Sequence, residues 1–417
     1  LMRRVDQLDG QAKEFLEAAA VAGRAFNLGP VATACSNDNK QETEMLLGTL
    51  TGQNLIEQLD GDDWRFNNAL VRDGIYDSLL SRRRADLHGE IAVALESHFA
   101  DRLNDVAEEL ARHFEAAGEP AKAVKYHALA GEKNLRVYAL DEAEDRFRAI
   151  MDTVAGTPDC ADDLFVADAA LNMARVLYYQ CDFRGIIAMI EAARPRFEAL
   201  NDPSHTARML CESGYAHVFS ARQVKGKAML EEALEIAEGC GDPGAIAHAL
   251  LGLLWYHVTY DAPGPEKDAV LLPLGDRTLA LAREIGNVWI QAKALLGLSM
   301  SRLFECRATE GRDYCRQLLS LGRDSGDPRP LTMGAAQLVF FDALAGDPDL
   351  AMEQGQQAID QSLCPVDRAL ASGALLTGRV MANMDGLSQA EAERLLADIA
   401  DLDKMMEDGD LRSAGNM

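Results

Sequence analysis

The sequence of 417 residues is short of positive charge. Its 41 Lys and Arg residues face 67 Asp and Glu residues, which gives a net charge of −26. Nucleic-acid-binding proteins neutralise phosphates with clustered Lys and Arg, and anionic membrane surfaces attract the same residues. We therefore expect neither a nucleic acid nor a membrane as a partner. Hydrophobic residues make up 48% and charged residues 26%, which excludes a wholly disordered chain.

Cysteine is sparse as well, and no apolar run is long. The eight cysteines include no Cys-x-x-Cys pair and none at zinc-ligand spacing from a histidine, so we expect reduced thiols in a cytoplasmic protein. The longest apolar run, 249–256, is far shorter than the roughly 18 residues of a membrane span. The first residues do not resemble a signal peptide, and both ends read like the interior of a longer sequence, so we expect a fragment.

Motifs of catalysis are missing too. The sequence contains no phosphate-binding loop of the Gly-x-x-x-x-Gly-Lys-Ser/Thr type, no His-Glu-x-x-His and no Gly-x-Ser-x-Gly. His248 and His257 are nine residues apart, which keeps them off one face of a helix. The sequence thus predicts a chain without enzyme activity, bound cofactor or metal ion.

Short segments recur in the second part of the chain. From about residue 86 the apolar residues follow a helical period, and the segment 249–253 (Ala-Leu-Leu-Gly-Leu) recurs at 294–298. In a Gly-Asp-Pro mark, Gly ends one helix, Asp caps the next, and Pro takes the first helical position. The chain has this mark at 241–243 and 326–328, and related marks as Asn-Asp-Pro at 201–203 and Gly-Asn at 286–287. Their spacing predicts helix pairs of about 40 residues that bury their apolar faces only against neighbouring pairs.

These helix pairs resemble the tetratricopeptide repeat (TPR) family. Its motif has a large–small residue pair in the first helix and a small residue in the second, where the two helices cross closely. The matching pairs are Met173-Ala174, Ser213-Gly214, Leu251-Gly252 and Leu296-Gly297, and the matching small residues are Ala193 and Ala233. The repeats are degenerate, because Thr278 and Leu318 occupy small positions and the period exceeds 34 residues. The resemblance implies a mainly α fold, a right-handed TPR-like α-solenoid.

Residues 1–85 follow a different pattern. We predict helices over 6–24, 29–35 and 38–51, and a β-hairpin whose segments 54–59 and 64–66 flank the turn at 60–63. Three helices followed by a hairpin is the order of a winged helix. Residues 1–100 nevertheless hold 10 basic and 16 acidic residues, and the basic run 82–84 reads as a solvated helix start. We expect this unit to pack against other protein modules rather than enter a DNA groove.

The stretch 66–88 carries the most specific motif. It resembles the junction that follows the ATPase core in bacterial signal-transduction ATPases with numerous domains (STAND), including those fused behind class III adenylate/guanylate cyclase domains. The matching residues are Phe66, Ala69, Leu70, Val71, Arg72, Asp73, Tyr76, Ser78, Leu79, Arg82, Arg83, Arg84, Leu87 and His88, whereas Asn68 replaces the usual His. Residues 19–26 also resemble the winged-helix start of this family. The resemblance implies intramolecular ATPase or cyclase partners outside these residues.

Eight residues are candidates for binding a protein or peptide partner. Alignment on the large–small pairs places them where TPR arrays present a concave groove, and Tyr and Arg suit such a surface. The alternative, that half of them are ordinary core or inter-repeat residues, stays open. The candidates are Arg175, Tyr178, Tyr179, Tyr215, Phe219, Tyr256, His257 and Arg302. The groove is also expected to be less negative than the outer face of the array.

These observations predict three segments: a winged-helix-like domain (1–85), a helical junction with the first TPR-like helices (86–160) and a TPR-like solenoid (161–417). The favoured hypothesis is the regulatory and sensory region of a STAND-type ATPase associated with an adenylate/guanylate cyclase. The alternative is the same region of a STAND-type transcription regulator whose DNA-binding domain lies outside the chain. A stand-alone adaptor is the third hypothesis, and the flanking reading frame discriminates among the three.

Overall fold

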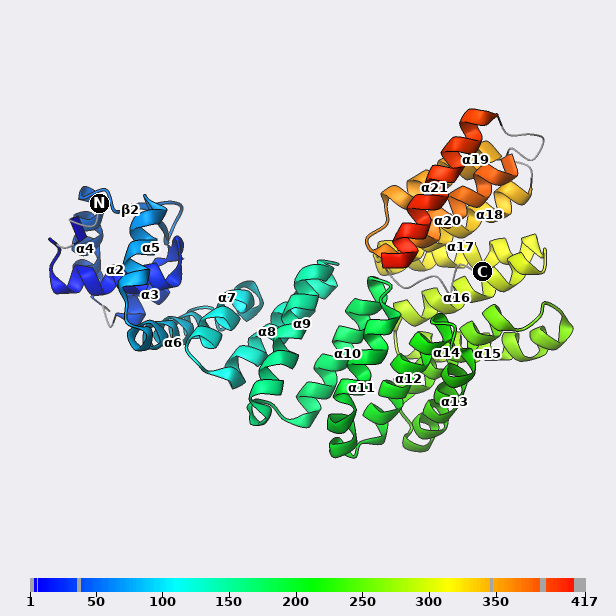
Figure 1. Cartoon of the computed structure of the whole chain (residues 1–417), viewed down its shortest axis with the longest axis horizontal. Helices are drawn as coiled ribbons and strands as arrows, with labels where there is room; N and C mark the ends of the chain where they lie inside the picture. The colour runs from blue at the N-terminus through cyan, green and yellow to red at the C-terminus, as the bar shows by residue number, and fades with distance from the viewer. Residues whose placement is uncertain (1–3, 6, 36–38, 346–347, 383–387, 409–417) are drawn as a thin grey trace. The chain divides into compact units, whose positions relative to one another are not determined.

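A computed structural model describes residues 4–408 except 6, 36–38, 346–347 and 383–387 (Figure 1). The chain divides into two compact units. The first comprises residues 1–136 and 145–161, and the second residues 137–144 and 162–417. None of the helices in the described ranges is long and apolar enough to cross a membrane.

The first unit opens with three helices and a small sheet. The three strands are antiparallel in the order β1-β3-β2, and Gly61 has a φ of 59° in the turn between β2 and β3. The predicted hairpin is thus confirmed, whereas β1, which has only three residues, was not predicted. The elements are α2 (Gly10–Ala22), β1 (Ala25–Asn27), α3 (Leu28–Ala34), α4 (Lys40–Gly52), β2 (Ile56–Gln58) and β3 (Asp63–Phe66). The core contains the neighbouring rings of Phe15, Phe26 and Phe66.

Four helices complete most of the first unit, and they contain the 66–88 motif. Arg72 donates from Nε to the carbonyl oxygen of Ala20 at 2.8 Å, so the motif joins α5 (Ala69–Ser78) to α2. The guanidinium groups of Arg72 and Arg84 lie 4.8 and 4.4 Å from the ring centroid of Tyr76. The motif thus forms internal contacts of this unit. The helices are α5 (Ala69–Ser78), α6 (Ser81–His98), α7 (Leu103–Ala116) and α8 (Pro120–Arg136).

A buried chain of hydrogen bonds continues from Tyr76. Its hydroxyl lies 3.1 Å from Nε2 of His88, whose Nδ1 lies 2.9 Å from Nδ1 of His113. Arg112 reaches Nε2 of His113 at 2.9 Å, and because an arginine can only donate, His113 donates to His88 and His88 donates to Tyr76. Each imidazole then carries one proton. Burial and the neighbouring His113 lower the pKa of His88 to about 3, which keeps it neutral.

The second unit is an array of helix pairs, and α9 (Leu140–Gly156) contributes residues to both units. The first helices of the pairs are α10 (Asp163–Tyr179), α12 (Pro203–Phe219), α14 (Pro243–Tyr260), α16 (Val288–Phe304), α18 (Pro328–Leu344) and α20 (Pro365–Ala382). The second helices are α11 (Phe183–Leu200), α13 (Gln223–Cys240), α15 (Pro265–Glu284), α17 (Ala308–Ser325), α19 (Pro348–Asp360) and α21 (Gln389–Asp408). The short 3-10 helix η1 (Pro158–Cys160) precedes α10.

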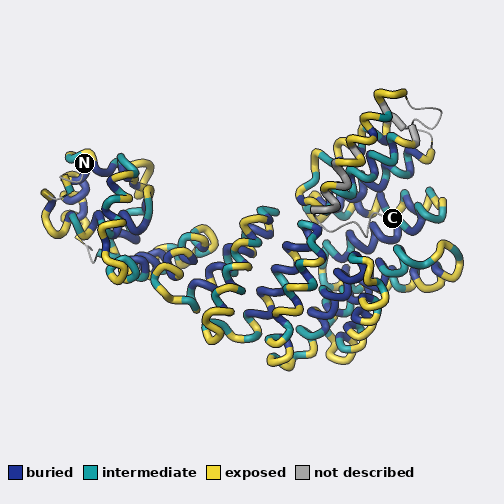
Figure 2. Tube along the Cα trace, viewed as in Figure 1, coloured by how far each residue is buried: buried dark blue, intermediate teal, exposed yellow. Residues whose placement is uncertain are grey.

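The six first helices form a closed ring. Each of them contacts the next in the series, and α20 returns to contact α10. Burial separates the two layers, because α12 buries 11 of its 17 residues whereas α13 buries five of its 18 (Figure 2). The first helices consequently face the interior of the second unit, and the second helices cover them from outside.

The predicted repeat marks are confirmed. Asp202, Asp242 and Asp327 accept hydrogen bonds from the first backbone N–H groups of α12, α14 and α18, and a proline occupies the first turn of each helix. Asn201 and Gly241 end the preceding helices in the left-handed conformation, with φ of 50° and 71°. The spacing of the marks therefore gives the spacing of the helix pairs.

Small residues stand where first and second helices cross closely, as the TPR-like pattern predicts. A Cβ atom at Gly214 would come within 2.8 Å of Leu230 and 3.1 Å of the carbonyl oxygen of Gly226. At Gly252 it would come within 2.5 Å of the same Leu230. A larger residue at either position would have to displace Leu230, and at Gly214 it would also crowd the backbone of Gly226, so packing favours glycine at both positions.

Candidate functional site

Aromatic and charged side chains from all six ring helices gather in the interior of the second unit. We call them the central cluster: Tyr178 and Tyr179 of α10, Tyr215 of α12, His248 and Trp255 of α14, Trp289 and Lys293 of α16, Arg329 of α18 and Asp367 of α20. The ring centroids of Tyr178 and Trp289 are 5.6 Å apart, so residues from α10 and α16 meet across the ring of helices. Tyr215 lies 5.8 Å from Tyr178, also between ring centroids.

Lys293 is a buried cation without a polar partner. Its side chain is 6% exposed, and it makes neither a hydrogen bond nor an ion pair with the described part of the chain. Its Nζ atom lies 5.4 Å from the ring centroid of Tyr178 and 5.2 Å from that of Trp255. Burial lowers the pKa of Lys293 to about 8, although the carboxylate of Asp367 opposes the shift.

The two rings compensate only part of this burial. A cation–π contact contributes roughly 0.5–2 kcal/mol, whereas burying an ammonium group costs several kcal/mol. A buried lysine that is retained at such a cost commonly has a functional role rather than a structural one. Lys293 is therefore the residue around which we build the candidate site.

Arg329 supplies the second cation of the central cluster. Its Nε atom donates to Asp367 at 2.9 Å, and its Nη1 atom lies 3.1 Å from the hydroxyl of Tyr179. The guanidinium carbon stacks 4.5 Å from the ring centroid of Tyr179. Since Asp367 neutralises one of the two cations, Lys293 and Arg329 against Asp367 give a formal charge of +1 in a protein of net charge −26.

Several polar atoms in the same place are buried and unpartnered. Among the described residues, Nη2 of Arg329, Nε1 of Trp255 and Nε1 of Trp289 have no hydrogen-bond partner, although water cannot reach them. All three atoms can only donate. Nε2 of His248 is also without a partner among the described residues. Buried donors are nearly always paired, so this concentration calls for an explanation by function.

The structure brings four of the eight predicted residues together. Tyr178, Tyr179 and Tyr215 belong to the central cluster, and the ring of Phe219 packs 5.6 Å from that of Trp255. They lie in the interior of the helix ring and are at most 9% exposed. Arg175 is exposed on α10; burial raises the pKa of Tyr179 and lowers that of His248, and the charge of Arg175 lowers both to a smaller extent.

Arg302 lies in a different environment. Its side chain is fully buried and pairs with Asp268 of α15, with Glu305 at 3.1 Å and with Glu310 of α17 at 3.5 Å. This position makes Arg302 a residue that holds three helices together rather than one that a partner can reach.

Tyr256 and His257 are partly buried near the end of α14. Lys227 lies 5.1 Å from the ring centroid of Tyr256, and Nδ1 of His257 lies 2.7 Å from a carboxylate oxygen of Asp261. Tyr256 thus contacts the preceding helix pair and His257 pairs within its own repeat, and neither belongs to the central cluster.

Sequence reasoning missed Lys293, Trp289, Arg329 and Asp367. The large–small pairs directed attention to the C-terminal halves of the first helices, whereas Trp289 and Arg329 each stand two residues after the cap that begins their helix. The signal in the sequence was a large aromatic or basic residue at this second position, Trp289 or Arg329. In α16 it is followed one turn later by Lys293. Their meeting with α10 depends on ring closure, which local sequence does not encode.

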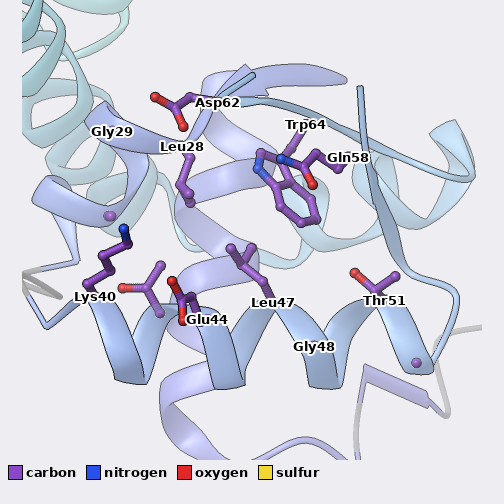
Figure 3. A pocket seen from close by; sticks show the side chains of 13 residues that line it. Leu28, Gly29, Lys40, Glu44, Leu47, Gly48, Thr51, Gln58, Asp62 and Trp64 are labelled. Carbon is purple, nitrogen blue, oxygen red and sulfur yellow. The ribbon is translucent and has the colours of Figure 1, made fainter. Parts of the chain in front are cut away.

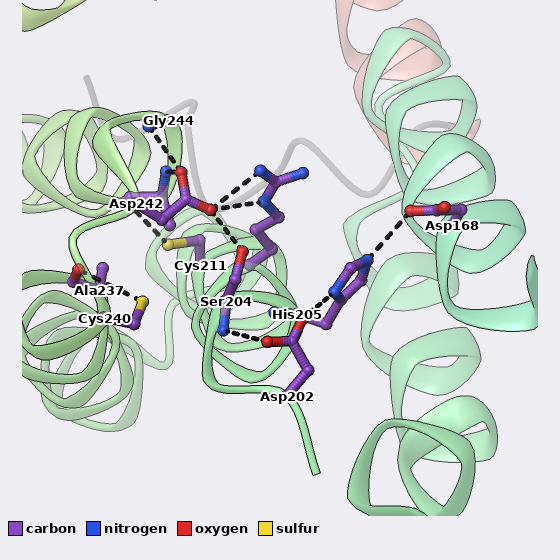
Figure 4. Close-up of polar contacts among 11 residues, drawn as sticks. Asp168, Asp202, Ser204, His205, Cys211, Ala237, Cys240, Asp242 and Gly244 are labelled. Atoms are coloured by element: carbon purple, nitrogen blue, oxygen red, sulfur yellow. Dashed lines mark hydrogen bonds and ion pairs between the residues drawn. The ribbon is translucent and has the colours of Figure 1, made fainter. Parts of the chain in front are cut away.

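Some of the polar contacts between repeats lie at the caps (Figure 4). Asp242 caps α14 through the N–H groups of Gly244 and Ala245, and it also accepts from the hydroxyl of Ser204 at 2.5 Å and from Arg208 at 2.9 Å. Likewise, His205 lies 3.2 Å from the carboxylate of Asp168 on α10. The repeat marks thus join neighbouring helix pairs in addition to capping helices.

The first unit contains a pocket of about 720 Å³ between α3, α4 and the hairpin (Figure 3). Its lining residues include Lys40, the carboxylates Glu44 and Asp62, and the apolar Leu47 and Trp64. One cation against two carboxylates does not favour an anionic ligand such as a phosphate backbone. In neither unit do the described residues contain a cluster of His, Cys, Asp and Glu that could hold a metal ion.

No protein-family model and no curated protein sequence matches the chain. Two solved structures are similar in fold. One is a STAND protein with a tetratricopeptide repeat sensor from Pyrococcus horikoshii, with 14% identity, a TM-score of 0.59 and coverage of 97% of this chain. The chain spans 58% of the length of that protein.

The second similar structure is a Rap protein complexed with competence and sporulation factor. It has 12% identity and a TM-score of 0.56, and the alignment covers 88% of this chain and 94% of the other. The second unit is thus an array of TPR-like repeats, as the sequence predicted, and the whole fold is mainly α with one small three-stranded sheet. At these identities the comparisons establish the fold alone.

Proposed function

We propose that this chain is the sensory and regulatory region of a STAND-type signalling ATPase, and that its TPR-like array binds an effector. The observation that carries the proposal is the central cluster, where a buried lysine and several buried donors have no partner within the described chain. An array built only for structural support would gain stability from apolar residues at these positions. The STAND protein with a TPR sensor supports the same assignment through its similar fold.

The first unit is the proposed relay. Its order α2-β1-α3-α4-β2-β3 agrees with the winged-helix-like interpretation, and its motif at 66–88 resembles the junction that follows a STAND ATPase core. Binding of an effector can change the activity of a neighbouring domain only if the effector has different affinities for two arrangements of the protein. The proposal includes an upstream cyclase domain, no enzyme activity in the chain itself, and no DNA contact by the winged-helix-like unit.

The test uses the longer protein that contains this chain. Its ATPase and cyclase rates are measured with and without residues 162–417. We expect the deletion to change the basal rate several-fold, because it removes the region that biases the ATPase. Equal rates with and without the array would contradict the proposal. A helix-turn-helix in place of a cyclase domain in the flanking reading frame would favour the transcription-regulator alternative.

A further inference from the structure

We propose that the central cluster binds a small organic anion with an aromatic ring, held by Lys293 and Arg329 and stacked on the surrounding rings. This inference rests on the proposed effector-binding function, and it names the chemical class of the effector. It follows from the kind of polar atom that is unpartnered, from the charge of the cluster and from the number of aromatic faces in it.

The missing partner is an acceptor. The unpartnered Nη2 of Arg329 and the indole N–H groups of Trp255 and Trp289 can donate hydrogen bonds but cannot accept them, and the same holds for the ammonium of the buried Lys293. The single carboxylate of the cluster, Asp367, is already occupied by Nε of Arg329. A carboxylate or phosphate brings several acceptor lone pairs and a negative charge, so it satisfies these donors and neutralises Lys293 at once. A cationic or neutral ligand leaves the cluster charged.

The aromatic part of the ligand follows from the residues around the two cations. Lys293 lies over the rings of Tyr178 and Trp255, and Arg329 lies over the ring of Tyr179. Tyr178 is 5.6 Å from both Tyr179 and Trp289, between ring centroids, so the rings connect the two cations. Such rings pack against a planar group by offset or edge-to-face contacts.

Entry of the ligand requires the ring of helices to open. The residues of the central cluster are buried in the closed arrangement, and α10 and α20 are in contact although they are far apart in the chain. This contact can separate without breaking a short interhelix connection, unlike the contacts between consecutive pairs. The ligand binds more tightly to the arrangement that surrounds its anionic group with Lys293 and Arg329. This difference in affinity between two arrangements is what a sensor needs.

The proposal is tested by isothermal titration calorimetry on the full chain at pH 7. The probes are 2-naphthoate and adenosine 5′-monophosphate, which distinguish a carboxylate from a phosphate, with 2-naphthamide and adenosine as neutral counterparts. At least one anion is expected to bind about tenfold or more tightly than its neutral counterpart. Equal affinities of each anion and its counterpart, or no binding of either anion at about 1 mM, would overturn the proposal.

The variant Lys293→Met removes the charge and keeps the length of the side chain. We expect it to reduce anion affinity at least about tenfold while a thermal scan shows a folded protein. The matched control is Lys227→Met, because Lys227 also lies over an aromatic ring, that of Tyr256, but outside the central cluster. The control should bind like the wild type. Anion binding by Lys293→Met at wild-type affinity would contradict the assignment.

The pH dependence gives a second readout. Five groups face Lys293 or act on its charge: Tyr178, Cys181, Arg329, Cys364 and Asp367. Burial raises the pKa values of Tyr178, Cys181 and Cys364, so these groups stay neutral at moderately alkaline pH.

Anion affinity of the wild type should therefore fall as the pH rises above about 8, the pKa of Lys293, and should be roughly tenfold weaker at pH 9.5. A flat pH profile would contradict the role of Lys293. Failure of these binding tests leaves the deletion test on the longer protein unaffected, so the two proposals can fail separately.

Discussion

Lys293 and Arg302 lie on the same helix, α16, and both are buried, but their surroundings differ. Arg302 pairs with Asp268, Glu305 and Glu310, whereas no carboxylate of the described chain pairs with Lys293. The first environment uses a buried charge to join three helices. In the second, the charge has no polar partner among the described residues, and we propose that an anionic ligand supplies one. Burial alone therefore does not identify a candidate binding residue. A buried cation with carboxylate partners has a structural role, whereas a buried cation without them is a candidate for binding.

The largest effect is expected from Arg302→Met. The substitution leaves Asp268 and Glu305 without their buried partner, so the free energy of unfolding should fall by about 3 kcal/mol. This value is at the low end for a broken buried pair because Asp268 and Glu310 retain contact with water, at 18% and 47% side-chain exposure. Urea denaturation monitored by circular dichroism measures the change. An unchanged midpoint would remove the structural role of Arg302.

The opposite sign is expected for Lys293→Met. Since Lys293 has no partner to lose, its replacement by an apolar side chain of similar length should raise the free energy of unfolding by about 2 kcal/mol at pH 7. The matched control is Lys267→Met, which also removes a buried lysine but leaves the carbonyl oxygen of Val258 without its donor at 3.0 Å. That variant should lose stability. If both variants lose stability equally, the distinction between paired and unpaired lysines fails.

Alkaline pH sharpens the same measurement. Lys293 is protonated up to a pH of about 10.5 in the unfolded chain but only up to about 8 in the folded one. Between these values the unfolded state binds the extra proton, so the Lys293 contribution to the free energy of unfolding rises with pH, by at most about 1.4 kcal/mol per unit. The difference between the wild type and Lys293→Met should shrink from pH 8 to pH 9.5 in chemical denaturation. A constant difference would contradict a neutral Lys293 at high pH.

A smaller loss of stability is expected when the capping aspartate of a repeat mark is replaced, and its size should depend on how many hydrogen bonds that aspartate accepts. Asp242 caps α14 and also accepts hydrogen bonds from Ser204 and Arg208, whereas Asp327 accepts from the N–H group of Arg329. Asp242→Ala should therefore cost about 1.5 kcal/mol and Asp327→Ala about 1 kcal/mol. Thermal unfolding of both variants checks the order. Equal losses would mean that the links from Asp242 to the preceding helix pair contribute nothing.

In the first unit, His88 is a buried group of a third kind, because it has hydrogen-bond partners and is neutral. The pKa of His88 is lowered to about 3 in the folded protein, so between pH 6.5 and pH 3 the unfolded chain binds more protons at this site. The contribution of neutral His88 to the free energy of unfolding is fully present above pH 6.5 and is lost as the pH falls towards 3. From pH 6.5 to 5.5 the wild type should lose about 1 kcal/mol more than His88→Gln in denaturant unfolding. Parallel losses would contradict a neutral His88–His113 pair.

Local features of the fold could be predicted from the sequence because they depend on neighbouring residues. The marks at Asp202, Asp242 and Asp327 gave the helix starts, and the large–small pairs gave the close crossings at Gly214 and Gly252. Tyr178, Tyr179 and Tyr215 were correctly grouped on the first helices, although their role as candidate partner-binding residues remains a prediction.

The rest of the site depends on contacts between distant repeats. Lys293 is one of several polar residues in the sequence of α16, and only the meeting of α10, α14 and α16 shows that it has no acceptor among the described residues. Arg302 illustrates the converse, since its partners Asp268 and Glu310 belong to two other helices. Whether a charge is paired is a property of the tertiary structure, and residue type at a repeat position does not determine it.

Closure of the helix ring also bears on how the second unit folds. An open repeat array can nucleate at any repeat and grow by adding neighbours, because each repeat contacts only the next. In this chain the hydrogen bond between Arg329 and Tyr179 spans 150 residues of sequence, and that between Arg329 and Tyr138 spans 191. Such contacts form only after the intervening repeats are in place and carry a large loop-closure entropy. The ends of the array are therefore joined last, in a slow step that couples all of its repeats into one cooperative unit.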